Sequence, residues 1–127
     1  MTMRRLRLPR IWRDEAGTSA VEFALVFPAL IMLTLGSVNM SLLLYAVSTL
    51  HFAVEDTARW CSLNSSSCTT NTDVQTHTHY AGPAISPVFT LAAGGCSGKA
   101  VTGSATFRFQ AGLLNRSVPI SATACFP

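Results

Sequence analysis

The chain has 127 residues, of which 49% are hydrophobic and only 12% are charged. Soluble domains carry about 25% charged residues, so this composition excludes an ordinary soluble domain and points to a membrane protein with at most one folded domain. The net charge of +3 lies entirely in the first fifteen residues, where five arginines outnumber two carboxylates.

Residues 1–17 form an arginine-rich leader. Apart from Trp12, no aromatic residue is interleaved with its arginines, so we expect no nucleic-acid binding. Positive residues that precede an apolar segment hold that end of the chain in the cytoplasm. The leader is therefore predicted to be cytoplasmic.

A carboxylate stands at the start of the apolar segment that follows. The small-residue stretch that begins at Gly17 and Thr18 ends at Glu22 and Phe23. An ionised carboxylate costs about 2.5–3.5 kcal/mol at the centre of a membrane helix, and less near the interface. A carboxylate at this position has no function in a helix that serves only as a membrane anchor. It can have one in a subunit whose helix packs beside related helices.

Residues 23–45 carry no charge and are predicted to cross the membrane. Spanning takes about 20 apolar residues, and this run is longer than the apolar core of a signal peptide, which has about 7–15. Pro28 is expected to kink the helix, because its ring removes one backbone hydrogen bond that neighbouring groups replace in a membrane. Asn39 is expected near the outer interface.

The helical pattern continues beyond the membrane, to about residue 60. One apolar face joins Leu43, Val47, Leu50, Val54 and Ala58, which follow one another at steps of three or four residues. A helix over residues 18–60 is about 64 Å long at 1.5 Å per residue, about twice the hydrocarbon thickness. Its outer half must therefore pack on the chain's own C-terminal domain, on a neighbour, or on both.

Residues 61–127 are predicted to form an extracytoplasmic β-rich domain. A polar loop over 61–82 comes first. Strand-like segments follow at residues 86–91, 101–109 and 118–124, and residues 111–116 connect the last two into an antiparallel hairpin. Pro87 confines the first segment to a sheet edge or a strand start. The expected fold is α+β, with the long helix covering a small antiparallel sheet.

All four cysteines follow the predicted span: Cys61, Cys68, Cys96 and Cys125. An oxidising outer compartment favours disulfides, and three pairings are possible. We favour Cys61–Cys68, which closes a small loop at the helix end, with Cys96–Cys125, which ties the chain before the hairpin to its last strand. Each bond typically contributes about 2–4 kcal/mol to a domain with a thin core.

A zinc site is the competing interpretation of the cysteines, with His77 and His79 nearby. Zinc fingers place two to four residues between paired cysteines, whereas six separate Cys61 from Cys68. We therefore expect no metal and no cofactor. The sequence contains no nucleophile elbow and no phosphate loop, so we expect no enzymatic activity either.

The junction resembles that of type IV pilin-like proteins, and more narrowly that of TadE-like pseudopilins of the Tad (Flp, tight-adherence) pilus system. The residues that carry this resemblance are Asp-Glu-Ala-Gly-Thr-Ser-Ala-Val-Glu-Phe-Ala-Leu-Val-Phe-Pro-Ala-Leu, which follow the arginine leader. The resemblance covers about residues 13–60 and extends in general terms to a β-rich tail after a cysteine-containing loop.

This resemblance implies that prepilin peptidase cuts between Gly17 and Thr18 on the cytoplasmic side. Glu22 then becomes the fifth mature residue, followed by Phe23, and its carboxylate neutralises the amine of an adjacent subunit during assembly. The implied partners are the peptidase, other pilin and pseudopilin subunits, the Tad inner-membrane machinery and membrane lipid. The implied location is the bacterial inner membrane, crossed once, with the C-terminus in the periplasm.

Two functions remain open at this point. A tail this large favours a minor pilin or pseudopilin over a major pilin. The alternative is an uncleaved single-pass anchor that carries an envelope binding module, with Gly17 as a helix-start glycine and Glu22 reaching the lipid headgroups.

Overall fold

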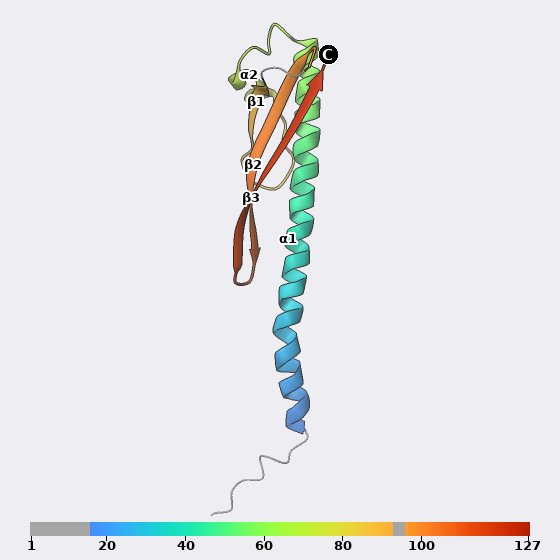
Figure 1. Ribbon diagram of the computed structural model, residues 1–127, viewed down its shortest axis with the longest axis vertical. Coiled ribbons are helices and arrows are strands. Elements are labelled where there is room, and N and C mark those ends of the chain that lie inside the picture. Colours follow the sequence, from blue (N-terminus) through green and yellow to red (C-terminus); the bar gives the residue numbers. More distant parts are fainter. Residues whose placement is uncertain (1–15, 93–95) are drawn as a thin grey trace, which may run out of the picture. The chain divides into compact units, whose positions relative to one another are not determined.

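The computed structural model describes residues 16–92 and 96–127, so predictions about the first fifteen residues lie outside the described part. The first element is the helix α1, Ala16–Leu63, which is drawn from blue to green in Figure 1. It starts two residues before the expected helix and ends three residues after it. Pro28 lies inside α1 without ending it, and the expected kink stays a prediction.

The chain divides into two units, residues 1–34 and 35–127. In the first unit, α1 is exposed from Gly17 to Thr34. Among the described residues, α1 is the one helix long and apolar enough to span a membrane, and its apolar window is not buried by other parts of the chain. The expected span over residues 23–45 lies within this helix, and its bounds stay a prediction.

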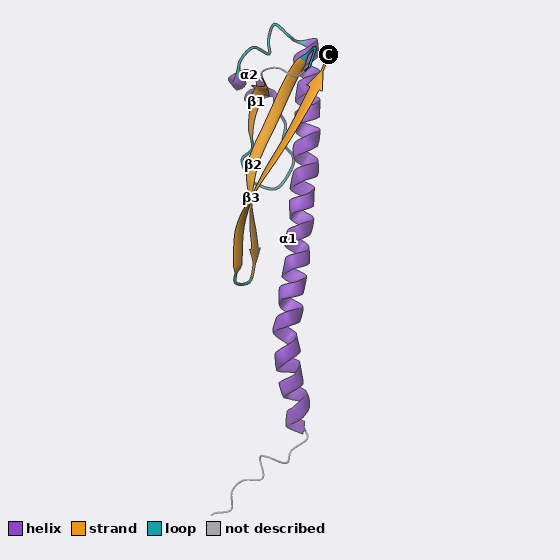
Figure 2. Ribbon diagram, in the orientation of Figure 1, coloured by secondary structure: helices purple, strands orange, loops and turns teal. Residues whose placement is uncertain are grey.

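The second unit contains a three-stranded antiparallel sheet, which Figure 2 shows in orange. Its strands are β1 (Val88–Ala92), β2 (Lys99–Ala111) and β3 (Leu114–Phe126), in the order β1-β2-β3. The central strand is the one predicted from alternation, and Pro87 lies just before an edge strand, as expected. The α+β fold, with a long helix on a small antiparallel sheet, is confirmed.

The predicted connection over residues 111–116 is wrong, because the hairpin turn contains only Gly112 and Leu113. The ladder closes at the pair Ala111 and Leu114. Gly112 has a φ of 59°, and a two-residue hairpin turn needs a positive φ that glycine adopts without strain. Around this turn several apolar residues follow one another without alternation, so periodicity alone does not locate the strand ends.

The outer half of α1 packs on the chain's own sheet. The buried residues of its inner face are Ala46, Leu50, Ala53, Val54, Thr57, Ala58 and Cys61. A Cβ placed on Gly103 would lie 2.7 Å from Val54 Cγ2 and 2.8 Å from Phe89 Cε1, so the helix approaches β2 where β2 has no side chain. Of the predicted apolar face, Leu50, Val54 and Ala58 are buried, with the sheet as their cover, whereas Leu43 and Val47 are only partly buried.

A second helix replaces part of the predicted loop over residues 61–82. This helix, α2 (Asn71–His77), begins with a capping box in which Thr70 Oγ1 accepts from the amide of Asp73 at 3.2 Å. The amide of Thr70 in turn donates to Asp73 Oδ2 at 2.9 Å. Threonine followed by aspartate three residues later satisfies the free donors of a helix start. The expectation of a loop is corrected here.

Side chains of α2 also occupy the free edge of the sheet. Gln75 Oε1 accepts from the amide of Phe89 at 2.7 Å, and Asn71 Oδ1 accepts from the amide of Leu91 at 2.9 Å. Unpaired backbone donors on an edge strand invite pairing with other chains. The short helix thus closes the β1 edge with its own amide side chains.

Candidate functional site

Glu22 lies on the exposed surface of α1, inside the first unit. Within the described part of the chain it makes no hydrogen bond and no ion pair. The side chains that follow it along α1 are apolar and exposed, with Phe23 stacked on Phe27 at a ring-centroid distance of 5.3 Å. The carboxylate thus has no partner within the described chain and stands on a surface suited to lipid or to other helices.

The predicted processing site lies in the first two turns of α1. Gly17 and Thr18 are both helical and exposed. A Cβ on Gly17 would meet no described atom within 4 Å, so packing among residues 16–92 and 96–127 does not require glycine there. Thr18 and Glu22 are four residues apart, which places them on the same face of the helix.

Polar residues of the apolar segment are satisfied by the helix itself. Thr34 Oγ1 donates to the carbonyl of Ile31 at 2.9 Å, and Ser41 Oγ donates to the carbonyl of Ser37 at the same distance. Such back-bonding lets hydroxyl groups enter a membrane without an outside partner. Glu22 differs from these residues, because a carboxylate has no proton to donate when it is ionised.

Asn39 bonds a different part of the chain. Its Nδ2 donates to the carbonyl of Leu35 at 2.9 Å and to the carbonyl of Gln110, near the turn of the hairpin, at 2.6 Å. The sequence placed Asn39 near the outer interface but could not show this partner, because the two residues are 71 positions apart.

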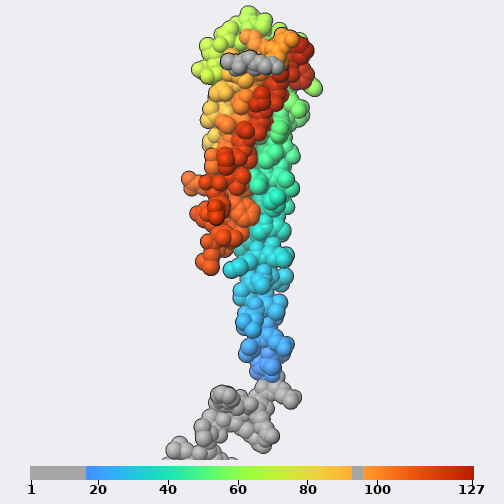
Figure 3. All heavy atoms as spheres, in the orientation of Figure 1, coloured from blue at the N-terminus to red at the C-terminus, as the bar shows by residue number. Residues whose placement is uncertain are grey.

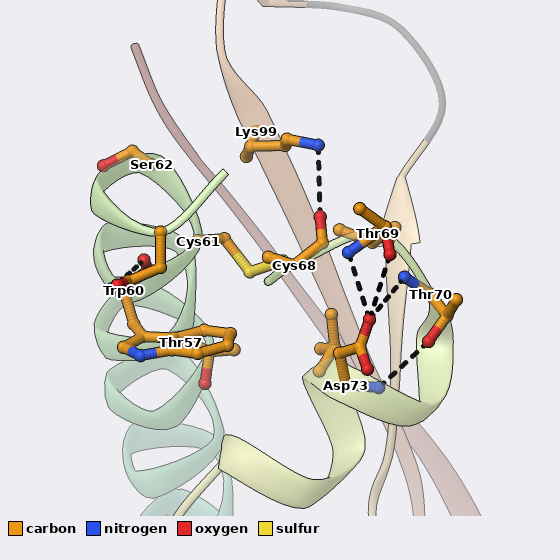
Figure 4. Close-up of a disulfide and its surroundings, with 12 residues drawn as sticks. Thr57, Trp60, Cys61, Ser62, Cys68, Thr69, Thr70, Asp73 and Lys99 are labelled. Atoms are coloured by element: carbon orange, nitrogen blue, oxygen red, sulfur yellow. Dashed lines mark hydrogen bonds between the residues drawn. A yellow bond between two sulfur atoms is a disulfide. The ribbon is translucent and has the colours of Figure 1, made fainter. Parts of the chain in front are cut away.

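The two favoured disulfides are formed. The Cα atoms of Cys61 and Cys68 are 5.2 Å apart, and those of Cys96 and Cys125 are 6.4 Å apart. Figure 4 shows the first bond between the end of α1 and the chain that leads to α2. Close to it, Lys99 Nζ donates to the carbonyl of Cys68 at 3.1 Å, which joins this loop to β2.

Three of the four residues of the competing zinc interpretation have other contacts, and no contact of His79 with the described residues bears on it. Cys61 and Cys68 bond each other, so neither is available as a thiolate ligand. His77 stacks on Trp60 with ring centroids 3.8 Å apart and joins α2 to α1. Among the described residues, no group of three or more potential ligands is placed to hold a metal ion.

The pKa of the Asp73 carboxyl lies below its ordinary value. The amide of Thr70 is the main donor that stabilises its carboxylate, with further bonds from the Thr70 hydroxyl and the Thr69 amide, and together they lower the pKa of Asp73. This is capping chemistry, which fixes the start of α2. It does not indicate catalysis.

Comparison with known proteins locates a family signature on α1. The sequence profile of the family described as TadE-like protein matches residues 17–59. No curated protein and no solved structure matches the chain. The matched segment begins at Gly17, contains Glu22, and stops before the cysteines and the sheet. The resemblance to TadE-like proteins is therefore confirmed over residues 17–59, which indicates a protein associated with the Tad pilus.

Proposed function

We propose that this chain is a minor pilin or pseudopilin, a non-enzymatic structural subunit of Tad pilus assembly and secretion. Prepilin peptidase would remove the leader between Gly17 and Thr18 in the inner membrane. The observation that carries the proposal is Glu22. It is an exposed carboxylate without a partner in the described chain, on an apolar helix whose sequence matches the TadE-like family.

Cleavage would create the cation that Glu22 lacks. An α-amino group has a pKa of about 7.7–8.0 and is mostly protonated at neutral pH. A new ammonium at Thr18 would also stand at the positive end of the helix dipole, which disfavours it unless an anion lies close. A carboxylate and an ammonium that pair in low dielectric offset part of each other's desolvation cost.

The geometry of α1 allows this pairing within one chain as well as between chains. Side chains on a helix lean toward its N-terminus, so Glu22 leans toward Thr18 of its own chain. Pairing between neighbouring subunits is favoured by the exposed surface of the helix, because no other described part of the chain buries the apolar window of α1. The test must therefore measure contact between subunits as well as processing.

Gly17 supports cleavage because the described part of the chain gives no reason for a glycine at this position. A Cβ built on Gly17 would meet no described atom within 4 Å, so packing among the described residues leaves room for a larger side chain. A peptidase that needs close backbone approach at the cleaved bond supplies a reason for glycine that the fold itself does not.

The first experiment determines the mature N-terminus. The full chain is expressed in cells with an active prepilin peptidase, extracted from membranes and measured by intact mass spectrometry. We expect a mature protein that begins at Thr18, and we expect Gly17→Leu to keep its leader. An intact leader on the wild-type chain would overturn the proposal and favour the uncleaved envelope binding module.

The second experiment tests the role of Glu22. We expect Glu22→Gln to enter the membrane normally but to lose cross-linking to pilin subunits, whereas Glu22→Asp keeps part of it because the charge remains. Glu55→Gln is the matched control, because Glu55 is an exposed carboxylate on the same helix outside the predicted span. Normal cross-linking by Glu22→Gln would refute the pairing between subunits.

A further inference from the structure

The turn of the β2–β3 hairpin exposes leucines that do not pack on the described chain. We call residues 110–114 the hairpin tip. Leu113, in the turn, is 93% exposed, and Leu114 is 63% exposed. A hairpin turn in water is ordinarily built from polar residues and glycine, so two exposed leucines at this point need an apolar environment.

The hairpin tip lies beside the apolar part of α1. Within the second unit, the hairpin runs alongside the helix in Figure 1, and the atoms of the two elements lie side by side in Figure 3. The bond from Asn39 Nδ2 to the carbonyl of Gln110 joins the two elements at the start of the tip. Asn39 belongs to the predicted membrane span over residues 23–45.

The position of Asn39 sets the depth of the tip. Asn39 lies six positions before Tyr45, the last residue of the predicted span, and therefore about 9 Å deeper along the helix than the outer end of that span. The helix surface between them is apolar and exposed, with Met40, Leu42 and Leu44 among its residues. A membrane that covers this surface therefore also reaches the hairpin tip.

The charges near the tip suit a phospholipid surface. Residues 96–127 contain Lys99, Arg108 and Arg116 and no acidic residue. Arg108 and Arg116 lie close to the tip on the two paired strands, and both are exposed. Arginine side chains form charge-assisted hydrogen bonds with phosphate oxygens, so the strands that flank the leucines complement anionic headgroups.

We propose that the hairpin tip inserts into the headgroup layer of the same membrane that α1 crosses, as a second membrane contact of this chain. Leu113 and Leu114 bury their side chains among the upper acyl chains, and Arg108 and Arg116 bind lipid phosphates. The tip stops at the interface because the free amides of its turn need water or phosphate partners, which the hydrocarbon layer lacks. This contact rests on the proposed membrane span of α1.

Tryptophan fluorescence in vesicles tests the contact. The full chain carrying Leu113→Trp is reconstituted in vesicles of phosphatidylcholine and phosphatidylglycerol, with and without bromine on the acyl chains. Two controls replace other exposed leucines. Leu33→Trp marks the span, and Leu63→Trp marks the opposite end of α1. The signal of the native tryptophans is subtracted using the unsubstituted chain.

We expect brominated lipid to quench the new tryptophan at positions 33 and 113 but not at 63. Quenching at 113 should weaken when Arg108 and Arg116 are both replaced by glutamine, and also when phosphatidylglycerol is omitted. Quenching at position 33 alone would overturn the tip contact but remain consistent with the span. Another subunit would then be the partner that covers the two leucines. Absence of quenching at 33 would overturn both, and quenching at all three positions would refute a contact specific to the tip.

Discussion

Replacing Gly103 by alanine should destabilise the second unit by overpacking the contact between α1 and the sheet. The new Cβ would lie 2.7 Å from Val54 Cγ2 and 2.8 Å from Phe89 Cε1. Carbon atoms in good contact are about 3.5–4.0 Å apart, so the neighbours must retreat by about 1 Å. Val54 and Phe89 are both buried, which leaves them little space to move into.

The magnitude follows from the behaviour of packed cores. Inserting a methyl group into a well-packed core costs about 1–3 kcal/mol, a large share of the roughly 5–15 kcal/mol that stabilises a typical domain. A loss of about 2 kcal/mol lowers the Tm of a domain with fewer than 100 residues by roughly 8–16 °C. We expect a shift of this size.

Thermal unfolding of the full chain in detergent micelles measures this shift, with the disulfides kept oxidised. Gly36→Ala is the matched control, because a Cβ at Gly36 meets nothing within 4 Å and alanine favours a helix. Val54→Ala should partly rescue Gly103→Ala, because it removes one of the two clashing atoms, and the double mutant should lose less than the two single mutants combined. A Tm for Gly103→Ala no lower than that of Gly36→Ala would refute the close packing at this point.

Three further predictions concern the outer part of the chain. The ionised carboxylate of Asp73, whose pKa is lowered in the folded chain, stabilises α2 fully above about pH 5, and this contribution is lost as pH falls through the lowered pKa. Asp73→Asn should remove the pH dependence of the amide protection factors in α2, which are corrected for the intrinsic exchange rate at each pH, and an unchanged dependence would contradict it. Replacing Cys96 and Cys125 by serine removes a link across 29 positions and should cost about 3–4 kcal/mol in chemical unfolding, so an unchanged unfolding midpoint would argue against this pairing. Asn39→Leu removes the donor to the Gln110 carbonyl and should cost about 1 kcal/mol, seen as amide exchange at the hairpin tip about fivefold faster, with equal exchange as the contradicting result.

Several features of the fold could be predicted from the sequence because they produce a regular spacing of apolar residues. The uncharged run over residues 23–45 indicates a span, and the steps from Leu50 to Val54 and Ala58 indicate a buried helix face. Alternation along β2 indicates a strand with one covered side. In each case one environment acts on many successive residues, so the pattern is long enough to recognise.

Other features depend on short signals that periodicity does not contain. The helix α2 has only seven residues, and its one sequence signal is the capping box between Thr70 and Asp73. The hairpin turn depends on the positive φ of Gly112. Both signals are present in the sequence, but each involves very few residues. An irregular loop accounts for such short signals as well as the helix start and the hairpin turn do.

The sequence by itself determined the apolar helix, the isolated carboxylate at Glu22 and the strand with alternating burial. Only the tertiary structure decided what these elements contact. Gln75 satisfies the edge of β1, and Asn39 bonds the Gln110 carbonyl at the hairpin tip. The physical reason is that local periodicity shows only whether each residue is buried or exposed. A hydrogen bond between residues 71 positions apart depends instead on how the folded chain places two distant backbone segments side by side.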